Sequence, residues 1–156
     1  MSSKSLELRF LAEPMDVNFG GKVHGGMVMK WIDQGGFACA VNWCGGYAVT
    51  VYVGGIRFFK PIHIGNLVEV RSRLIHTGKT SMHIAVDVYS KKPEDQDYVH
   101  NTHCIIIFVG VDKDNKPVQV PPFQPETEEE VKLQLYAIKL MELRKNIEEE
   151  MQSFYS

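Results

Sequence analysis

The segment between residues 18 and 33 contains residue types that can act on a carbonyl group. Gly25 and Gly26 stand where a long apolar stretch begins, and the first N–H groups of a helix have no partner within it. With no side chains in the way, a ligand oxygen can approach these N–H groups closely, helped by the helix dipole. The pair is therefore a candidate oxyanion hole for a thioester or ester carbonyl, with a tight turn packed against a strand as the alternative.

Asp33 is the second candidate, because it interrupts the apolar residues of a helix that we expect to be largely buried. A buried carboxylate must be paired, or it holds a proton more readily than an exposed one, which suits a general base. The alternative is a salt bridge to Lys30, although an acid is better placed before the base than after it. Gly35 and Gly36 lie in the middle of the expected helix, where glycine is less stable than alanine. Their presence predicts that a strand, a second copy of the helix or a ligand lies close to that face.

The run Gly78-Lys79-Thr80-Ser81 is a short break between two strand-like segments. Its simplest interpretation is a hairpin turn with a solvated lysine. The functional alternative is a phosphate contact through backbone and hydroxyl groups, to which Lys79 adds charge.

Other residue types give little sign of chemistry. His100 and His103 are three apart on an expected strand, so they should point to opposite faces and not share a metal ion. The three cysteines form no CxxC pair, which argues against a zinc module or disulfide framework and favours a reducing compartment. We therefore predict no metal site and no cofactor.

Length and charge limit the possible classes of protein. The chain has 156 residues, enough for one domain. A net charge of −2 excludes nucleic-acid binding driven by bulk charge. The longest apolar run, residues 104–109, is too short to span a bilayer, and the N-terminus lacks the apolar run of a secretory signal. We expect a cytoplasmic protein that binds neither nucleic acid nor membrane.

The elements that must position these residues follow from hydrophobic periodicity. Residues 25–42 are apolar on nearly every side, which predicts a buried central helix. Strands are expected over residues 6–12, 48–59, 67–77, 80–90 and 99–111. The pattern predicts an α+β fold in which one antiparallel sheet wraps around the central helix.

The composition changes after residue 120. Thr127 and Glu130 form a capping-box pattern, and apolar residues then recur at spacings of three or four for about 25 residues. We expect a single domain over residues 1–120, followed by an amphipathic C-terminal helix within residues 121–156. This helix should pack on its own domain or another subunit, with a partner helix or membrane surface as alternatives.

The string from Asn18 to Asp33 resembles the hotdog-fold acyl-CoA thioesterases of the cytosolic, brain acyl-CoA hydrolase type. Residues 57–61, Gly65 before Val68 and the turn at residues 78–81 fit the same family in order and spacing. The resemblance covers roughly residues 5–112 and implies a hotdog fold.

The resemblance also implies roles for individual residues. Asp33 would be the catalytic carboxylate, as a general base on water or as a nucleophile. Backbone N–H groups of Gly25 and Gly26 would hold the thioester oxygen, and Asn18 would position the water or the carbonyl. Asn18 and Asp33 would come from different subunits of a dimer.

The same resemblance implies where the rest of the substrate and the other subunits lie. Coenzyme A would pass the turn formed by Gly78, Lys79, Thr80 and Ser81, and its phosphates would meet Lys79, Arg57 and Lys60. The dimer would use the small face at Gly35 and Gly36, and three dimers would form a hexamer.

We therefore expect an acyl-CoA thioesterase that hydrolyses fatty acyl-CoA to free acid and CoA. One alternative is a non-catalytic acyl-CoA-binding hotdog module whose terminal helix recruits a partner. Another is a hotdog dehydratase, for which His24 is the only candidate histidine near the right place.

Overall fold

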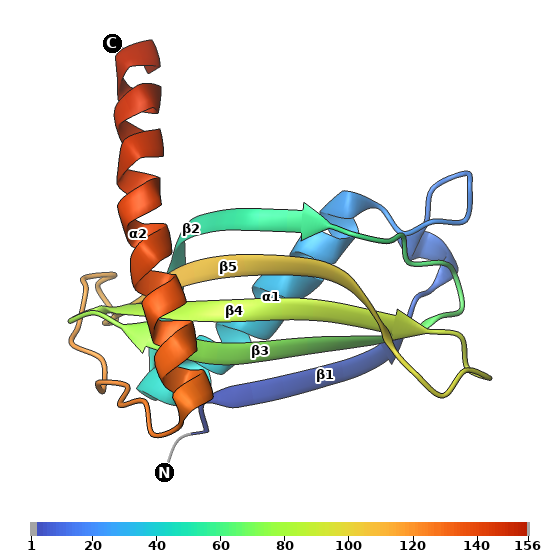
Figure 1. The fold of residues 1–156 in the computed structure, drawn as a ribbon, viewed down its shortest axis with the longest axis horizontal. Coiled ribbons are helices and arrows are strands. Elements are labelled where there is room, and N and C mark those ends of the chain that lie inside the picture. Colours follow the sequence, from blue (N-terminus) through green and yellow to red (C-terminus); the bar gives the residue numbers. More distant parts are fainter. Residues whose placement is uncertain (1–2, 156) are drawn as a thin grey trace.

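A five-stranded antiparallel sheet carries one helix on each of its two faces (Figure 1). The structure is a computed structural model in which residues 3–155 are described. The elements are β1 (Ser5–Leu11), the short 3-10 helix η1 (Pro14–Asp16), α1 (Gly25–Cys44), β2 (Tyr47–Phe58), β3 (Leu67–Thr77), β4 (Ser81–Lys91), β5 (Val99–Val111) and α2 (Glu128–Tyr155). The α+β hotdog architecture expected from the sequence is confirmed, and each expected strand lies within one residue of the observed one.

The strands lie in the order β1-β3-β4-β5-β2, so β1 and β2 form the two edges of the sheet. All neighbouring strands are antiparallel. The β2–β5 register shifts twice, between Thr50 and Tyr52 and between Gly54 and Arg57. Irregularities of this kind bend a strand and increase its twist, which helps the sheet curl around α1.

The main core lies between the sheet and α1. Alternate residues of the three central strands point toward this helix, as period-two strands require. They include Val70, Val86, Ile106 and Phe108, each no more than 1% exposed. This packing places α1 across the inner face of the sheet and so fixes where its residues lie.

The expectation that α1 is buried on nearly every side is wrong. The sheet covers only one side of the helix, and Met29, Lys30, Asp33 and Gln34 are exposed. The helix ends at Gly45, which takes the left-handed conformation (φ 72°) that favours glycine at a helix end.

The small residues of α1 serve the fold of this chain itself. A Cβ on Gly35 would lie 2.8 Å from Val70 Cγ1, and a Cβ on Gly36 would lie 3.1 Å from the Phe108 ring. The sequence allowed a strand, a second copy of the helix or a ligand to lie against Gly35 and Gly36, and the structure shows strands of the same chain there. The implied use of Gly35 and Gly36 in a dimer interface is therefore corrected.

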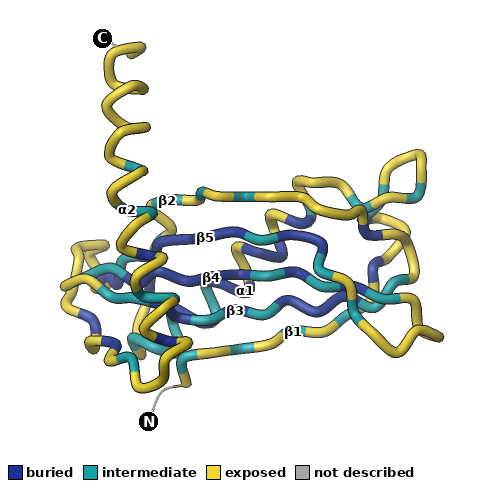
Figure 2. The backbone as a smooth tube through the Cα atoms, in the orientation of Figure 1, coloured by how far each residue is buried: buried dark blue, intermediate teal, exposed yellow. Residues whose placement is uncertain are grey.

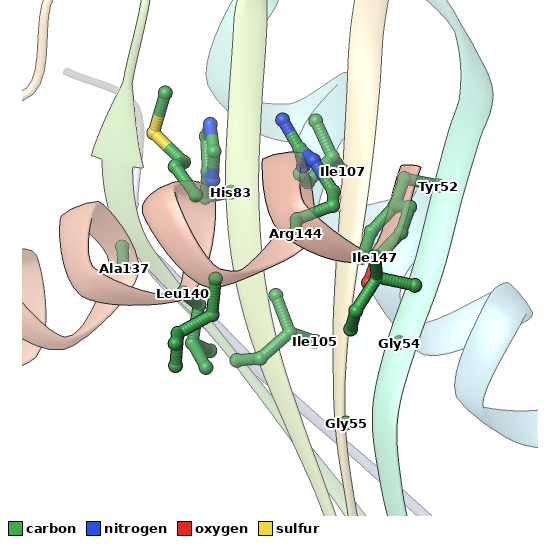
Figure 3. Close-up of a pocket in the computed structure, with 12 residues that line it drawn as sticks. Tyr52, Gly54, Gly55, His83, Ile105, Ile107, Ala137, Leu140, Arg144 and Ile147 are labelled. Carbon is green, nitrogen blue, oxygen red and sulfur yellow. The ribbon is translucent and has the colours of Figure 1, made fainter. Parts of the chain in front are cut away.

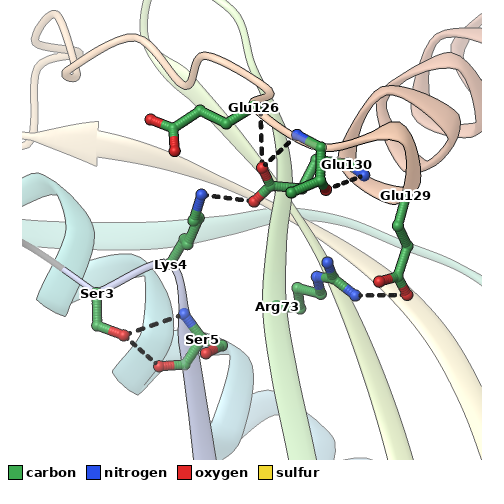
Figure 4. Close-up of polar contacts among 8 residues, drawn as sticks. Ser3, Lys4, Ser5, Arg73, Glu126, Glu129 and Glu130 are labelled. Atoms are coloured by element: carbon green, nitrogen blue, oxygen red, sulfur yellow. Dashed lines mark hydrogen bonds and ion pairs between the residues drawn. The ribbon is translucent and has the colours of Figure 1, made fainter.

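The start of α2 is fixed by polar contacts (Figure 4). Glu130 accepts hydrogen bonds from the backbone N–H groups of Glu126 and Thr127, and Thr127 Oγ1 accepts one from the Glu130 N–H. This is the capping box predicted from the sequence. Glu130 also forms an ion pair with Lys4, and Arg73 forms one with Glu129.

The first half of α2 packs on the outer face of the sheet, where Ala137 joins Ile75, Ala85 and Ile105 in a second, smaller core. Its second half extends past β2 and is exposed (Figures 1 and 2). Neither helix in the described part of the chain has the length and hydropathy needed to span a membrane.

Candidate active site

The start of α1 is open to solvent. Gly25 and Gly26 are exposed, and no backbone or side-chain acceptor within residues 3–155 takes up their N–H groups. The helix is preceded by His24 in extended conformation, whose side chain makes no capping hydrogen bond. These two N–H groups therefore have the properties expected of an oxyanion hole.

A hollow of about 260 Å³ lies beside this helix start. It is lined by Gly25 and Val28 of α1 and by Phe58, Phe59 and Lys60 at the end of β2, with four neighbouring residues. The structure thus brings together two of the predicted site residues, Gly25 and Lys60.

Asp33 lies two turns further along α1, on the exposed side of the helix. Its Oδ1 accepts a hydrogen bond of 3.0 Å from Thr50 Oγ1 on β2. The expected burial of Asp33 is therefore wrong for the single chain. The alternative pairing with Lys30 is also wrong, since no ion pair between the two occurs in the described chain.

Thr50 is the residue that sequence reasoning missed. The buried Ala48, two positions earlier, points toward α1, so Thr50 must do the same by strand alternation. Thr50 could have been noticed from the sequence as a polar residue at an inward-facing position of an expected strand. Recognising its partner required knowing how α1 lies across β2.

Asn18 lies in the loop before α1. Its side-chain oxygen accepts hydrogen bonds from the N–H groups of Gly20 (2.9 Å) and Lys22 (3.2 Å). The oxygen is thus used to shape the loop, which leaves the amide NH₂ group able to donate. Within the described residues, no hydrogen bond joins Asn18 to Asp33.

The other predicted coenzyme A contacts lie at two ends of the sheet. The residues 78–81 form a β3–β4 hairpin, in which the Gly78 N–H donates to the Ser81 carbonyl and Lys79 is exposed. Arg57 pairs with His103, which in turn pairs with Asp87 six residues along β4 from Ser81. Six strand residues span about 20 Å, so one chain does not bring the hairpin and Arg57 together.

The prediction that His100 and His103 point to opposite faces is wrong. Both rings lie within hydrogen-bonding distance of Asp87 Oδ1, at 2.7 Å and 2.8 Å. The β4–β5 register shifts between Val88 and Tyr89, which interrupts the alternation that the prediction assumed. Among residues 3–155, no three His, Cys, Asp or Glu side chains are arranged to hold a metal ion.

Two of the cysteines are poor nucleophiles. Burial raises the pKa of the Cys39 thiol to about 11 and that of the Cys104 thiol to about 12. Both therefore stay protonated at neutral pH, and the thiolate is the reactive form of cysteine. Asp33 remains the better candidate for the chemical step.

Comparison with known proteins shows that this chain is similar to thioesterases. The profile of the thioesterase superfamily matches residues 20–96, which include Gly25, Asp33 and Thr50. The acyl-CoA thioester hydrolase YciA of Salmonella typhimurium is 38% identical over 120 residues, covering 74% of this chain and 90% of that protein.

Solved structures extend the similarity to the whole fold. An apo-hexameric acyl-CoA thioesterase is 30% identical with a TM-score of 0.87, covering 92% of each chain. The acyl-CoA hydrolase of Staphylococcus aureus, solved with butyryl coenzyme A, coenzyme A and coenzyme A disulfide, is 25% identical with a TM-score of 0.87, covering 97% of this chain and 94% of that one.

The fold and the site define a hotdog protein with a carboxylate on its central helix. The chain belongs to the thioesterase superfamily, in the group of the acyl-CoA thioester hydrolases.

Proposed function

We propose that this chain is an acyl-CoA thioesterase in which Asp33 activates the attacking water. The observation that carries the proposal is the Thr50–Asp33 hydrogen bond, which holds a solvent-facing carboxylate in one orientation on the central helix. An oriented carboxylate that can accept a proton is what a general base requires.

Hydrolysis then proceeds by attack of water on the thioester carbon. The water loses a proton to the Asp33 carboxylate while its oxygen forms the new C–O bond. The N–H groups of Gly25 and Gly26 stabilise the negative charge that develops on the carbonyl oxygen. The C–S bond breaks, and the proton passes from Asp33 to the departing CoA sulfur.

One chain cannot supply both parts of this site. Gly26 and Asp33 are seven residues apart on α1, which is about 10 Å along a helix. Reacting groups must lie roughly 3–3.5 Å apart, so the oxyanion hole and the carboxylate of one chain do not reach one thioester carbon. The site therefore needs a second copy, whose Gly25, Gly26 and Asn18 face the Asp33 of the first.

The edge strand β2 provides the surface for this second copy. It is unpaired on one side, and Val51 and Val53 are 54% and 47% exposed. Exposed sheet edges favour pairing with another chain. Phe19, next to Asn18, is also fully exposed, as expected of a loop that packs on a partner.

The proposed division of the site between two copies implies how their β2 strands would pair. Gly25 lies beside Phe58, whereas Asp33 lies beside Thr50. Antiparallel pairing that brings Phe58 of one copy close to Thr50 of the other places the two-fold axis near Gly54. Each dimer then contains two equivalent sites, as an isologous interface requires.

This arrangement also brings the expected coenzyme A contacts together. The two-fold axis exchanges the two ends of the sheet, so the Gly78–Ser81 hairpin of one copy lies at the same end as Arg57 and Lys60 of the other. Lys79, Arg57 and Lys60 are all exposed and positively charged. They would contact the phosphates of one acyl-CoA bound between the two copies.

The dimer would assemble further into a hexamer, the state in which one similar acyl-CoA thioesterase was solved. We place the enzyme in the cytoplasm, where its three free cysteines would stay reduced. The mechanism requires no cofactor, since water and protein groups supply every proton and electron pair.

The test is release of CoA thiol from acetyl-, hexanoyl- and palmitoyl-CoA by wild type and Asp33→Asn. We expect hydrolysis by the wild type and a loss of at least about 1,000-fold in the variant, because Asn keeps the shape but cannot take up the proton. Gln34→Asn, on the same exposed face, is the control and should keep its activity. A wild type that binds acyl-CoA without releasing thiol would overturn the proposal in favour of the non-catalytic binding module.

A further inference from the structure

One continuous face of α2 is covered at its start and exposed at its end. Leu133, Ala137 and Leu140 pack on the outer face of the sheet. At the same spacing of three or four residues, this face continues through Arg144, Ile147, Met151 and Phe154. Of these, Ile147, Met151 and Phe154 are 55%, 47% and 89% exposed. The same helix face is thus apolar beyond the point where its own sheet ends.

The helix leaves the sheet at β2. Arg144 lies over the Tyr52 ring, with its guanidinium carbon 4.7 Å from the ring centroid. Ile147 lines, together with Gly54 and Gly55, a hollow of about 180 Å³ between α2 and the strands (Figure 3). The crossing point therefore coincides with the part of β2 through which the proposed two-fold axis passes.

The remaining length is sufficient to reach another sheet. From Ile147 to Tyr155 the helix rises about 12 Å, which corresponds to between two and three strand spacings. The direction of the helix is set by its anchored first half, where Glu130 and Ala137 are 5% and 1% exposed. A second copy paired along β2 would extend the sheet directly beneath this part of the helix.

We propose that residues 143–155, the distal segment of α2, dock on the outer face of a second copy across the β2 edge. Each helix bridges the two sheets, and the two α2 helices run antiparallel on either side of the two-fold axis. The apolar residues Ile147, Met151 and Phe154 pack on the partner as Leu133, Ala137 and Leu140 pack on their own sheet. This inference rests on the dimer of the proposed function.

The chemistry of the distal segment favours a protein partner over a lipid surface. Glu148, Glu149 and Glu150 form an acidic run within it. Membrane-binding amphipathic helices carry Lys and Arg on the polar face, because the cytoplasmic leaflet is anionic. At the crossing point, a Cβ on Gly55 would meet nothing within 4 Å, which leaves room for a second helix there, whereas the Tyr52 ring fills the space beside Gly54.

The first test is the oligomeric state of Ile147→Glu/Met151→Glu, measured with the full chain by sedimentation velocity over a range of concentrations. We expect the dissociation constant of the dimer to rise at least about 10-fold, because two charges would be buried at the interface. Ser153→Glu adds a charge on the opposite face of the helix and should leave assembly unchanged. Equal assembly of wild type and the double variant would overturn the inference.

The second test measures where the distal segments lie, by distances between spin labels at Asn146→Cys or Ser153→Cys in a Cys44→Ser background. In two antiparallel helices that meet near Arg144 and Ile147, equivalent residues lie farther apart the farther they are from that point. Seven residues rise about 10 Å on each helix, so the two residues 153 are offset by about 20 Å along the helix axes. With the axes about 10 Å apart, the shortest distance at residue 153 should exceed that at residue 146 by roughly 10–15 Å. The opposite order, as in helices that meet at their tips, would overturn the inference.

Failure of this inference can be distinguished from failure of the proposed function. Wild type that releases CoA, combined with unchanged assembly of the double variant, would leave the thioesterase intact and remove only the bridging helix. Wild type that releases no CoA, combined with weakened assembly of the double variant, would keep the bridging helix and overturn the thioesterase activity. Binding of the wild type to neutral or anionic vesicles without any change in assembly would assign the distal segment to a membrane surface instead.

Discussion

Thr50 Oγ1 donates a 3.0 Å hydrogen bond to Asp33 Oδ1, joining the edge strand to the central helix across 17 residues of sequence. The other carboxylate oxygen, Oδ2, receives no hydrogen bond within the described residues, and Asp33 is exposed. The carboxylate is therefore fixed through one oxygen while the other remains available to a water molecule.

Thr50→Val should lower kcat for acyl-CoA hydrolysis by roughly 10- to 100-fold, because a loosely held carboxylate spends less time in the productive orientation. Thr50→Ser keeps the hydroxyl group and should retain activity within a few-fold. Both are measured by thiol release over a range of substrate concentrations, so that kcat and KM are separated.

A positioning role for Thr50 predicts a change in kcat with little change in KM. Equal kcat values for Thr50→Val and the wild type would contradict that role. Equal losses in the Val and Ser variants, together with a lower melting temperature in both, would show that Thr50 serves the fold instead.

The fold could be predicted closely because its signals are local. Period-two alternation located the five strands, and the capping box of Thr127 and Glu130 located the start of α2. The order of the strands could not be read in this way, since it depends on pairing between distant segments. Thr50 was missed for the same reason: its partner, Asp33, is determined by how α1 crosses β2.

The errors about α1 have a single physical cause. Its residues are mostly apolar, and composition alone does not distinguish burial by the same chain from burial by a second copy. The structure leaves Met29, Asp33 and Gln34 exposed on one side and covers Gly35 and Gly36 on the other. The apolar composition of α1 therefore did not indicate which side of the helix its own sheet covers.

Gly35→Ala should destabilise the protein by about 1–3 kcal/mol, because overpacking of a closely packed core costs more than the helix gains from alanine. The added methyl group would lie 2.8 Å from Val70 Cγ1 and 3.0 Å from Ser72 Oγ. Gly26→Ala is the matched control, since a Cβ there meets nothing within 4 Å. Chemical denaturation measures both variants, and equal free energies of unfolding would contradict the close packing of Gly35 on β3.

Lowering the pH from 7 toward 4.5 should destabilise the protein through His83. Burial, with the nearby His76 and Arg144, lowers the pKa of His83 from 6.5 to about 4. Between these two values the unfolded chain binds the proton and the folded chain does not, so stability falls as the pH falls. The two pH units between 6.5 and 4.5 correspond to a loss of roughly 2–3 kcal/mol.

His83→Gln removes this titration and should flatten the dependence of unfolding free energy on pH between 6.5 and 4.5. The comparison uses denaturation curves of both proteins at equal chain concentration. Parallel curves for the two proteins over that range would show that His83 has the same proton affinity in the folded and unfolded chains.

Co-expression of Asn18→Ala with Asp33→Asn tests whether two copies build each site. Either variant alone should be nearly inactive, because every site in its dimer lacks one required group. In a mixed dimer both substitutions fall in one site, and the other site receives intact Asn18 and Asp33. Random pairing makes half of the dimers mixed, so the mixture should recover about a quarter of wild-type activity in the thiol-release assay. If Asn18 and Asp33 of the same chain formed the site, no mixture would contain an intact one and activity would stay at the level of the single variants.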